Sequence, residues 1–171
     1  MRASHTRLVF VFVFVFVSPL AFAQQPTSTA PNPAASRTMV SAADVQAMIA
    51  NAKNTRKPDQ ALMAQSMIQL APYNVSLEYR AAVANAAVHE TEAELFYVID
   101  GSATLVTGGK LTKENRTNAA NLTGAGIDGG TSRRVAKGDF IMVPEGVPHW
   151  FSAIDGTIVL MSLHLPRAPQ K

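Results

Sequence analysis

The sequence predicts an all-β domain, built as an antiparallel sandwich or barrel and preceded by short helices. From residue 67 onwards, apolar and polar residues alternate with a period of two, which is typical of half-buried strands. Turns that contain glycine separate these runs, as at Asp100-Gly101, Gly138-Asp139 and Asp155-Gly156. Many short strands joined by such turns are typical of sandwiches and barrels.

The N-terminus has the pattern of a secretory signal peptide. Arg2 and Arg7 precede an unbroken apolar run over residues 8–17, and Ala21-Phe22-Ala23 matches a cleavage site. The run is shorter than the roughly 20 residues of a membrane-spanning helix. We therefore expect residues 1–23 to be removed, the protein to be exported to the periplasm or secreted, and no stable membrane span to remain.

Charge and cysteine content exclude several classes of function. Arg2 and Arg7, two of the 15 basic residues, would leave with the signal, so 13 basic residues would face 12 acidic ones. This near balance predicts no nucleic-acid partner. The chain has no cysteine, which excludes disulfides and thiol catalysis. Its length fits one domain with one core.

A helical extension is expected ahead of the barrel. Residues 24–40 are rich in Pro, Gln, Thr and Ala, which predicts a disordered linker. Ser41 has Asp44 three residues later, so it is expected to cap a helix over residues 42–53.

A second short helix is expected over residues 59–65, capped by Asp59. The extension then spans residues 41–66 and the barrel residues 67–168. The polar segment 110–130 is expected to be a long loop at the barrel rim. Strands are predicted at 67–70, 75–80, 83–89, 94–99, 102–107, 131–136, 140–143, 149–154 and 157–165.

One motif near the C-terminus resembles a known family. Gly138, Pro144, Gly146 and His149 have the spacing G-x5-P-x-G-x2-H, which is similar to the second motif of the cupin superfamily. That motif usually continues to an Asn four residues after the His, where this chain has Ala153.

The first cupin motif is only partly present. Glu94 and Gly101 match its end, and His89 takes the position of its second histidine. Ala87 stands at the first histidine position and Ala81 at the leading glycine. The resemblance is therefore stronger for the fold than for the metal site.

The resemblance, to a small single-domain cupin of the conserved-barrel type, covers about residues 81–154 and implies a double-stranded β-helix of the jelly-roll type. Cupins commonly hold one divalent metal with three His and one Glu. The matching residues here are His89, Glu94 and His149, because Ala87 cannot bind a metal. These ligand types suit Fe, Mn, Zn, Ni or Cu and do not distinguish among them.

Strand parity sets a condition on this metal site. His89 and Glu94 are five residues apart, so they face the same side only if a bulge or bend lies between them. Without a bend, Glu90, Glu92 and Glu94 would share a face and Glu90 would replace a ligand histidine. Each residue of the set also has a structural interpretation, His89 as a surface histidine, His149 as a backbone-bonded one and Glu94 as a paired core acid.

Further residues are candidates for a pocket. Glu90, Phe96 and Phe151 could form its walls, although ordinary core packing explains the two aromatic side chains as well. Arg133 and Arg134 should face opposite sides of one strand, so that Arg133 could reach inward to a substrate carboxylate.

Two other residues are expected to have structural roles. Trp150 has the parity opposite to His149, which predicts an outward side chain in a dimer face, and His164 on the last strand is expected to pack or bond structurally.

The N-terminal signal pattern predicts export, and the resemblance implies that the protein binds a divalent metal cation and a small organic ligand in the barrel. A metal-dependent enzyme of the dioxygenase, isomerase or lyase type is one interpretation. The alternative is a non-catalytic small-molecule binding protein, or a structural cupin without metal. Exposed strand edges make a homodimer the expected assembly.

Overall fold

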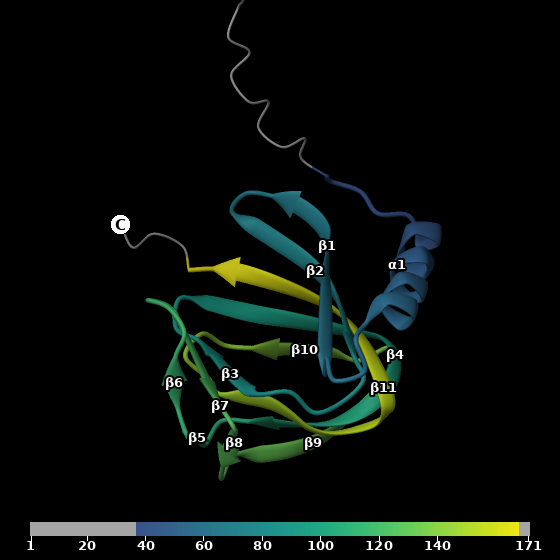
Figure 1. The fold of residues 1–171 in the computed structure, drawn as a ribbon. Coiled ribbons are helices and arrows are strands. Elements are labelled where there is room, and N and C mark those ends of the chain that lie inside the picture. Colours follow the sequence, from purple (N-terminus) through teal and green to yellow (C-terminus); the bar gives the residue numbers. More distant parts are fainter. Residues whose placement is uncertain (1–36, 168–171) are drawn as a thin grey trace, which may run out of the picture. The chain divides into compact units, whose positions relative to one another are not determined.

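The structure is a computed structural model that describes residues 37–167, and Figure 1 shows one helix beside a strongly curved β structure. Residues 1–23 and 24–36, where the signal peptide and most of the linker are predicted, lie outside the described residues. The helix is α1, Ala42–Thr55. The strands are β1 (Leu62–Leu70), β2 (Tyr73–Arg80), β3 (Ala86–His89), β4 (Glu92–Thr107), β5 (Lys110–Thr112), β6 (Asn115–Arg116), β7 (Asn121–Gly124), β8 (Gly126–Asp128), β9 (Thr131–Ala136), β10 (Phe140–Val143) and β11 (His149–Pro166).

The two longest strands, β4 and β11, run antiparallel along their whole lengths and bend together. Their pairing extends from His149 opposite Thr107 to Pro166 opposite Glu92. Register shifts interrupt it, and β11 curves around one side of the fold in Figure 1. The turns predicted to separate strands at Asp100-Gly101 and Asp155-Gly156 are therefore wrong, because each long strand passes through its own glycine.

The remaining strands extend this central pair on both sides. β2 and β3 pair with β11, β1 pairs with β2, and β7 and β6 follow β3. On the other side, β10 and β9 pair with successive halves of β4. This antiparallel arrangement confirms the predicted jelly-roll fold.

Helix α1 begins as the sequence predicts. The Ser41 hydroxyl accepts from the Asp44 amide at 3.1 Å, and the Asp44 carboxylate accepts from the Ser41 amide at 3.0 Å. This reciprocal capping box satisfies two amides that the first turn leaves free. The helix ends at Thr55 and packs on the outer side of β2 and β11, where Leu77 and Val159 are buried. Among residues 37–167, no helix is both long and apolar enough to cross a membrane.

The predicted second helix over residues 59–65 is wrong, because β1 begins at Leu62. Alanine, leucine, methionine and glutamine favour helix locally, but here Leu62–Leu70 pairs with β2 along its length. Met63 and Ile68 pack with the side chains beneath α1, which stabilises the strand through burial. The predicted loop 110–130 also differs, since it forms the short strands β5 to β8.

Candidate metal centre

Three imidazoles converge on one buried carboxylate. His89 ends β3, Glu94 lies in β4, and His149 and His164 lie near the two ends of β11. The Nε2 atoms of His89 and His149 lie 3.3 and 3.1 Å from Oε2 of Glu94, and Nε2 of His164 lies 3.4 Å from its Oε1. The structure thus brings together the three residues predicted from the motifs and adds His164.

The bend that strand parity required is present. β3 ends at His89, the backbone bends at Glu90 and Thr91, and β4 starts at Glu92. The carbonyl of His89 accepts from the Gly146 amide at 2.7 Å, which ties this bend to the turn before His149. The two cupin-like segments are therefore held together by the backbone.

Each imidazole is held from its far side. In each ring, Nδ1 faces an oxygen acceptor outside the cluster, which fixes the proton on Nδ1 and directs the Nε2 lone pair towards Glu94. The acceptors are Asn121 Oδ1 for His89 (2.6 Å), the Val147 carbonyl for His149 (3.3 Å) and Glu92 Oε2 for His164 (2.9 Å).

The orientation of the Asn121 amide follows from its neighbours. The Ala120 backbone amide donates to Oδ1 of Asn118 at 2.9 Å, and Nδ2 of Asn121 donates to the same oxygen at 3.1 Å. With its NH2 group engaged there, Asn121 presents Oδ1 to His89. The polar segment between β6 and β7 thereby sets the tautomer of His89.

Glu94 has one satisfied oxygen and one orphaned oxygen. The residue is 3% exposed, and the Ser162 hydroxyl donates to Oε1 at 2.5 Å. Oε2 has no hydrogen-bond donor within residues 37–167, since the short contacts to His89 and His149 lack hydrogen-bond geometry. A buried carboxylate oxygen in this state is costly unless a cation or a proton occupies the space before it.

The pKa directions agree with this arrangement. Burial raises the pKa of Glu94, but His149, His89 and Ser162 outweigh burial and hold this pKa below its usual range. Burial lowers the pKa of His89, whereas Glu94 and Asn121 raise it more, so the net shift is upward. Both shifts mean that a positive charge beside Glu94 is stabilised, and a divalent cation supplies such a charge.

Glu90 is not part of the cluster, so the interpretation in which it replaces a histidine is wrong. Arg116 binds it through two contacts, with Nη1 2.7 Å from Oε2 and Nη2 3.0 Å from Oε1. The bend at Glu90 and Thr91 turns this carboxylate away from the barrel interior. Glu92 instead supports His164.

Phe96 and Phe151 belong to the core and do not line the cavity at the cluster. Their rings meet edge to face at 5.5 Å, and Phe96 meets the His149 ring in the same way at 5.9 Å. They therefore support the cluster from the apolar side. Of the two interpretations of these aromatic residues, the structure agrees with ordinary core packing.

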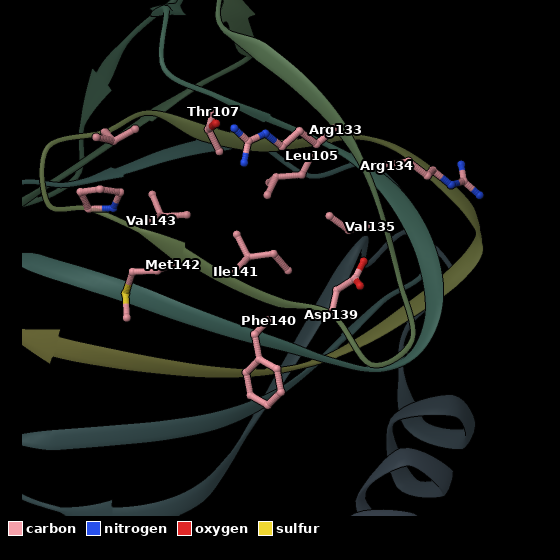
Figure 2. Close-up of a pocket in the computed structure, with 12 residues that line it drawn as sticks. Leu105, Thr107, Arg133, Arg134, Val135, Asp139, Phe140, Ile141, Met142 and Val143 are labelled. Carbon is pink, nitrogen blue, oxygen red and sulfur yellow. The ribbon is translucent and has the colours of Figure 1, made fainter.

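Arg133 lines a different cavity. This cavity has a volume of about 430 Å³ and is lined by residues of β4, β9 and β10. Figure 2 shows Arg133 beside Thr107 and Leu105, while the Arg134 side chain points away. Arg134 contacts Asp155 and donates to Ser102 Oγ at 2.9 Å. The Arg133 cavity shares no lining residue with the one at the cluster, so Arg133 does not reach a ligand there.

A cavity of about 350 Å³ opens onto the imidazoles. Ala87 lies on its wall, where its small side chain leaves space that a histidine would fill. The sequence does not single out three titratable residues that line this cavity, His164, Glu78 and Arg80. The signal for the last two was available, because charges two residues apart in an apolar strand face the same side.

Trp150 does not extend freely outward. Its indole nitrogen donates to the Ala84 carbonyl at 2.9 Å, and a Cβ at Gly126 would lie 3.2 Å from its ring. Trp150 therefore fastens the segment before β3 to β8, on the outside of the wall that carries His149.

These features define a class, a curved antiparallel barrel with a histidine and carboxylate centre at one end. Residues 49–166 match the family model described as Cupin, so the chain belongs to the cupin family. No curated protein matches the chain.

Several solved structures are similar in fold. KdgF from Halomonas sp. is 16% identical, with a TM-score of 0.48, and the match covers 66% of this chain and 86% of that one. A putative mannose-6-phosphate isomerase from Ralstonia eutropha JMP134 is 15% identical, with a TM-score of 0.45 and coverage of 65% and 88%. The structure of FeII HppE is 14% identical, with a TM-score of 0.47 and coverage of 65% and 54%.

Proposed function

We propose that this cupin is exported and binds one divalent metal ion through His89, Glu94 and His149, with a small organic ligand in the adjoining cavity. A metal-dependent reaction of the dioxygenase, isomerase or lyase type is the activity that such a centre would carry. The pattern of residues 1–23 supports export. Phe140 and Met142, both exposed on β10, support a homodimer.

The observation that carries the metal proposal is the orphaned Oε2 of Glu94 among imidazole nitrogens. Neutral imidazoles and a carboxylate are the donors that Fe, Mn, Zn, Ni and Cu accept. Lone pairs from these groups repel one another when nothing lies between them. A cation removes that repulsion, so the donor set fits a metal ion.

His164 is a further candidate ligand. Ligand atoms of His89, Glu94 and His164 all lie within 4.8 Å of one another, a group to which His149 does not belong, while Nε2 of His149 lies 3.1 Å from Oε2 of Glu94. The contact between Nδ1 of His164 and the Glu92 carboxylate is the arrangement that commonly orients histidine ligands of metals. His164 would thereby supply a third imidazole in place of the histidine that the motif has at position 87. The bound ion would act as a Lewis acid or lower the pKa of a bound water.

Metal analysis of untagged protein tests the proposal. We expect about one divalent ion per chain in the native protein and a loss of most of it in His149→Ala, because one ligand is removed. Glu90→Gln is the matched control, since that carboxylate lies outside the cluster and should leave the metal content unchanged. Equal trace metal in native protein and His149→Ala would overturn the proposal and favour a metal-free binding or structural cupin.

The support of His89 by Asn121 gives a separate prediction. We expect Asn121→Leu to weaken metal binding about 10- to 100-fold, because His89 loses the acceptor that fixes its tautomer. Asn121→Asp keeps an oxygen for Nδ1 and should retain most of the affinity. Competition with a chelator of known affinity measures both values, and equal losses in the two variants would show that the acceptor is not what matters.

A further inference from the structure

Strand β2 carries a charged pair into the barrel interior. Its side chains alternate, so that Leu77 and Tyr79 pack beneath α1 while Glu78 and Arg80 face the other side. In the register with β11, Glu78 lies opposite Leu160 and Arg80 opposite Ile158. Both β11 residues belong to the inner core, which places an acid and a base inside an otherwise apolar wall.

The pair uses only part of the hydrogen-bonding capacity of Arg80. Nε and Nη2 lie 2.8 and 2.7 Å from the same Glu78 oxygen, Oε2, and both side chains are 11% exposed. Within the part of the chain that the structure describes, Nη1 of Arg80 has no hydrogen-bond partner. The end of the guanidinium, where Nη1 and Nη2 present parallel N–H groups, is therefore available to a ligand.

The position of this guanidinium is constrained on one face as well. Its Cζ lies 4.7 Å above the centre of the Phe151 ring, a cation-π arrangement. Glu78 holds one edge and Phe151 one face, so the free end is oriented before any ligand binds. Such preorganisation lowers the entropic cost of binding.

Arg80 and Glu78 line the same cavity as His89, Glu94 and His149. We propose that the ligand of this cavity is a small carboxylate, whose two oxygens bind the free fork of Arg80 while the rest of the molecule lies towards the metal centre. The contact of the ligand with the metal centre rests on the proposed function, whereas the contact of its carboxylate with Arg80 does not. A planar two-oxygen anion matches the fork, whereas a neutral ligand of similar shape leaves its donors half used.

A matched pair of probes tests this assignment. Lactate and lactamide have the same shape, but only lactate carries the anion. We expect lactate to bind the zinc-loaded protein at least about tenfold more tightly, as measured by NMR titration, and to shift the Nε–H signal of Arg80. Equal affinity for the two probes, or an unmoved Arg80 signal, would overturn the proposal.

Variants test whether the preference for lactate over lactamide arises at Arg80. Removing Arg80 alone leaves Glu78 unpaired inside the barrel, so the double variant Glu78→Gln/Arg80→Gln, which keeps both shapes without charge, is the fair comparison. We expect it to bind both probes equally and Arg133→Gln, in the other cavity, to keep the preference for lactate. A double variant that still prefers lactate would also refute the role of Arg80.

Metal-free protein separates this inference from the proposed function. Acetate should still shift the Arg80 signal there, because the fork does not depend on the ion. A protein that binds acetate at Arg80 but takes up no metal would refute the metal proposal and keep the anion site. A protein that takes up metal but shows no effect of carboxylates on the Arg80 signal would keep the metal proposal and refute the anion site.

Discussion

Gly101→Ala is expected to destabilise the fold by at least about 4 kcal/mol, or to prevent folding. Gly101 has φ +81°, and a Cβ there would lie 2.1 Å from the Thr157 carbonyl oxygen. That oxygen belongs to the backbone of β11, which cannot move aside without breaking its pairing with β4. The free energy of unfolding in urea, followed by far-UV circular dichroism, measures the loss.

Gly156→Ala is the matched control. Gly156 also has a positive φ, +71°, and lies in β11 at the same bend, but a Cβ there would meet no atom within 4 Å. The substitution should cost about 1 kcal/mol, the penalty of the left-handed conformation alone. Similar losses in the two variants would show that the close approach of β4 and β11 at Gly101 does not limit stability.

These glycines also show why strand boundaries were misjudged from sequence. Asp-Gly between apolar runs predicts a hairpin turn, because glycine with positive φ serves turns well. Here the same property serves a bend shared by two paired strands, since Gly101 lies opposite Ile158. Local sequence specifies the backbone conformation at Gly101 but not whether the chain reverses there.

The cluster of histidines around Glu94 can be predicted from sequence where its spacing is local. His149 follows Gly146 through a rigid turn, and Glu94 precedes the bend glycine Gly101 at the motif spacing. His164 has no such local signal. It reaches the cluster because β11 bends and its register shifts between Phe151 and Ala153 and between Ile154 and Ile158. Parity cannot be carried across such bulges, so the sequence indicates only a structural role for His164.

The sequence also cannot identify which arginine lines the cavity at the imidazoles. Arg133 was predicted to face inward, and it does line a cavity next to Leu105. The protein, however, has separate cavities that share no lining residue, and sequence parity cannot say which one a side chain enters. Arg80, which lies opposite Ile158 of β11, lines the cavity of the imidazoles instead.

Glu94→Gln is expected to reduce metal affinity by more than about 100-fold, more than any change to the outer hydrogen bonds. Glu94 is the one residue that all three imidazoles approach, whether the ion lies nearer His149 or nearer His164. The variant should stay folded, because the amide has the same shape and can donate to an imidazole Nε2. Calorimetric titration with zinc measures the affinity, and urea unfolding of the metal-free protein checks the fold.

Glu92→Leu separates the contribution of His164 from that of Glu94. The Glu92 carboxylate holds Nδ1 of His164 at 2.9 Å, and leucine offers no acceptor in its place, so the substitution should weaken zinc binding about 10- to 100-fold if His164 is a ligand. His164→Ala should then lower the affinity at least as far. Native affinity in both variants, with loss only in Glu94→Gln and His149→Ala, would remove His164 from the ligand set, because a ligand cannot be deleted without changing the free energy of binding.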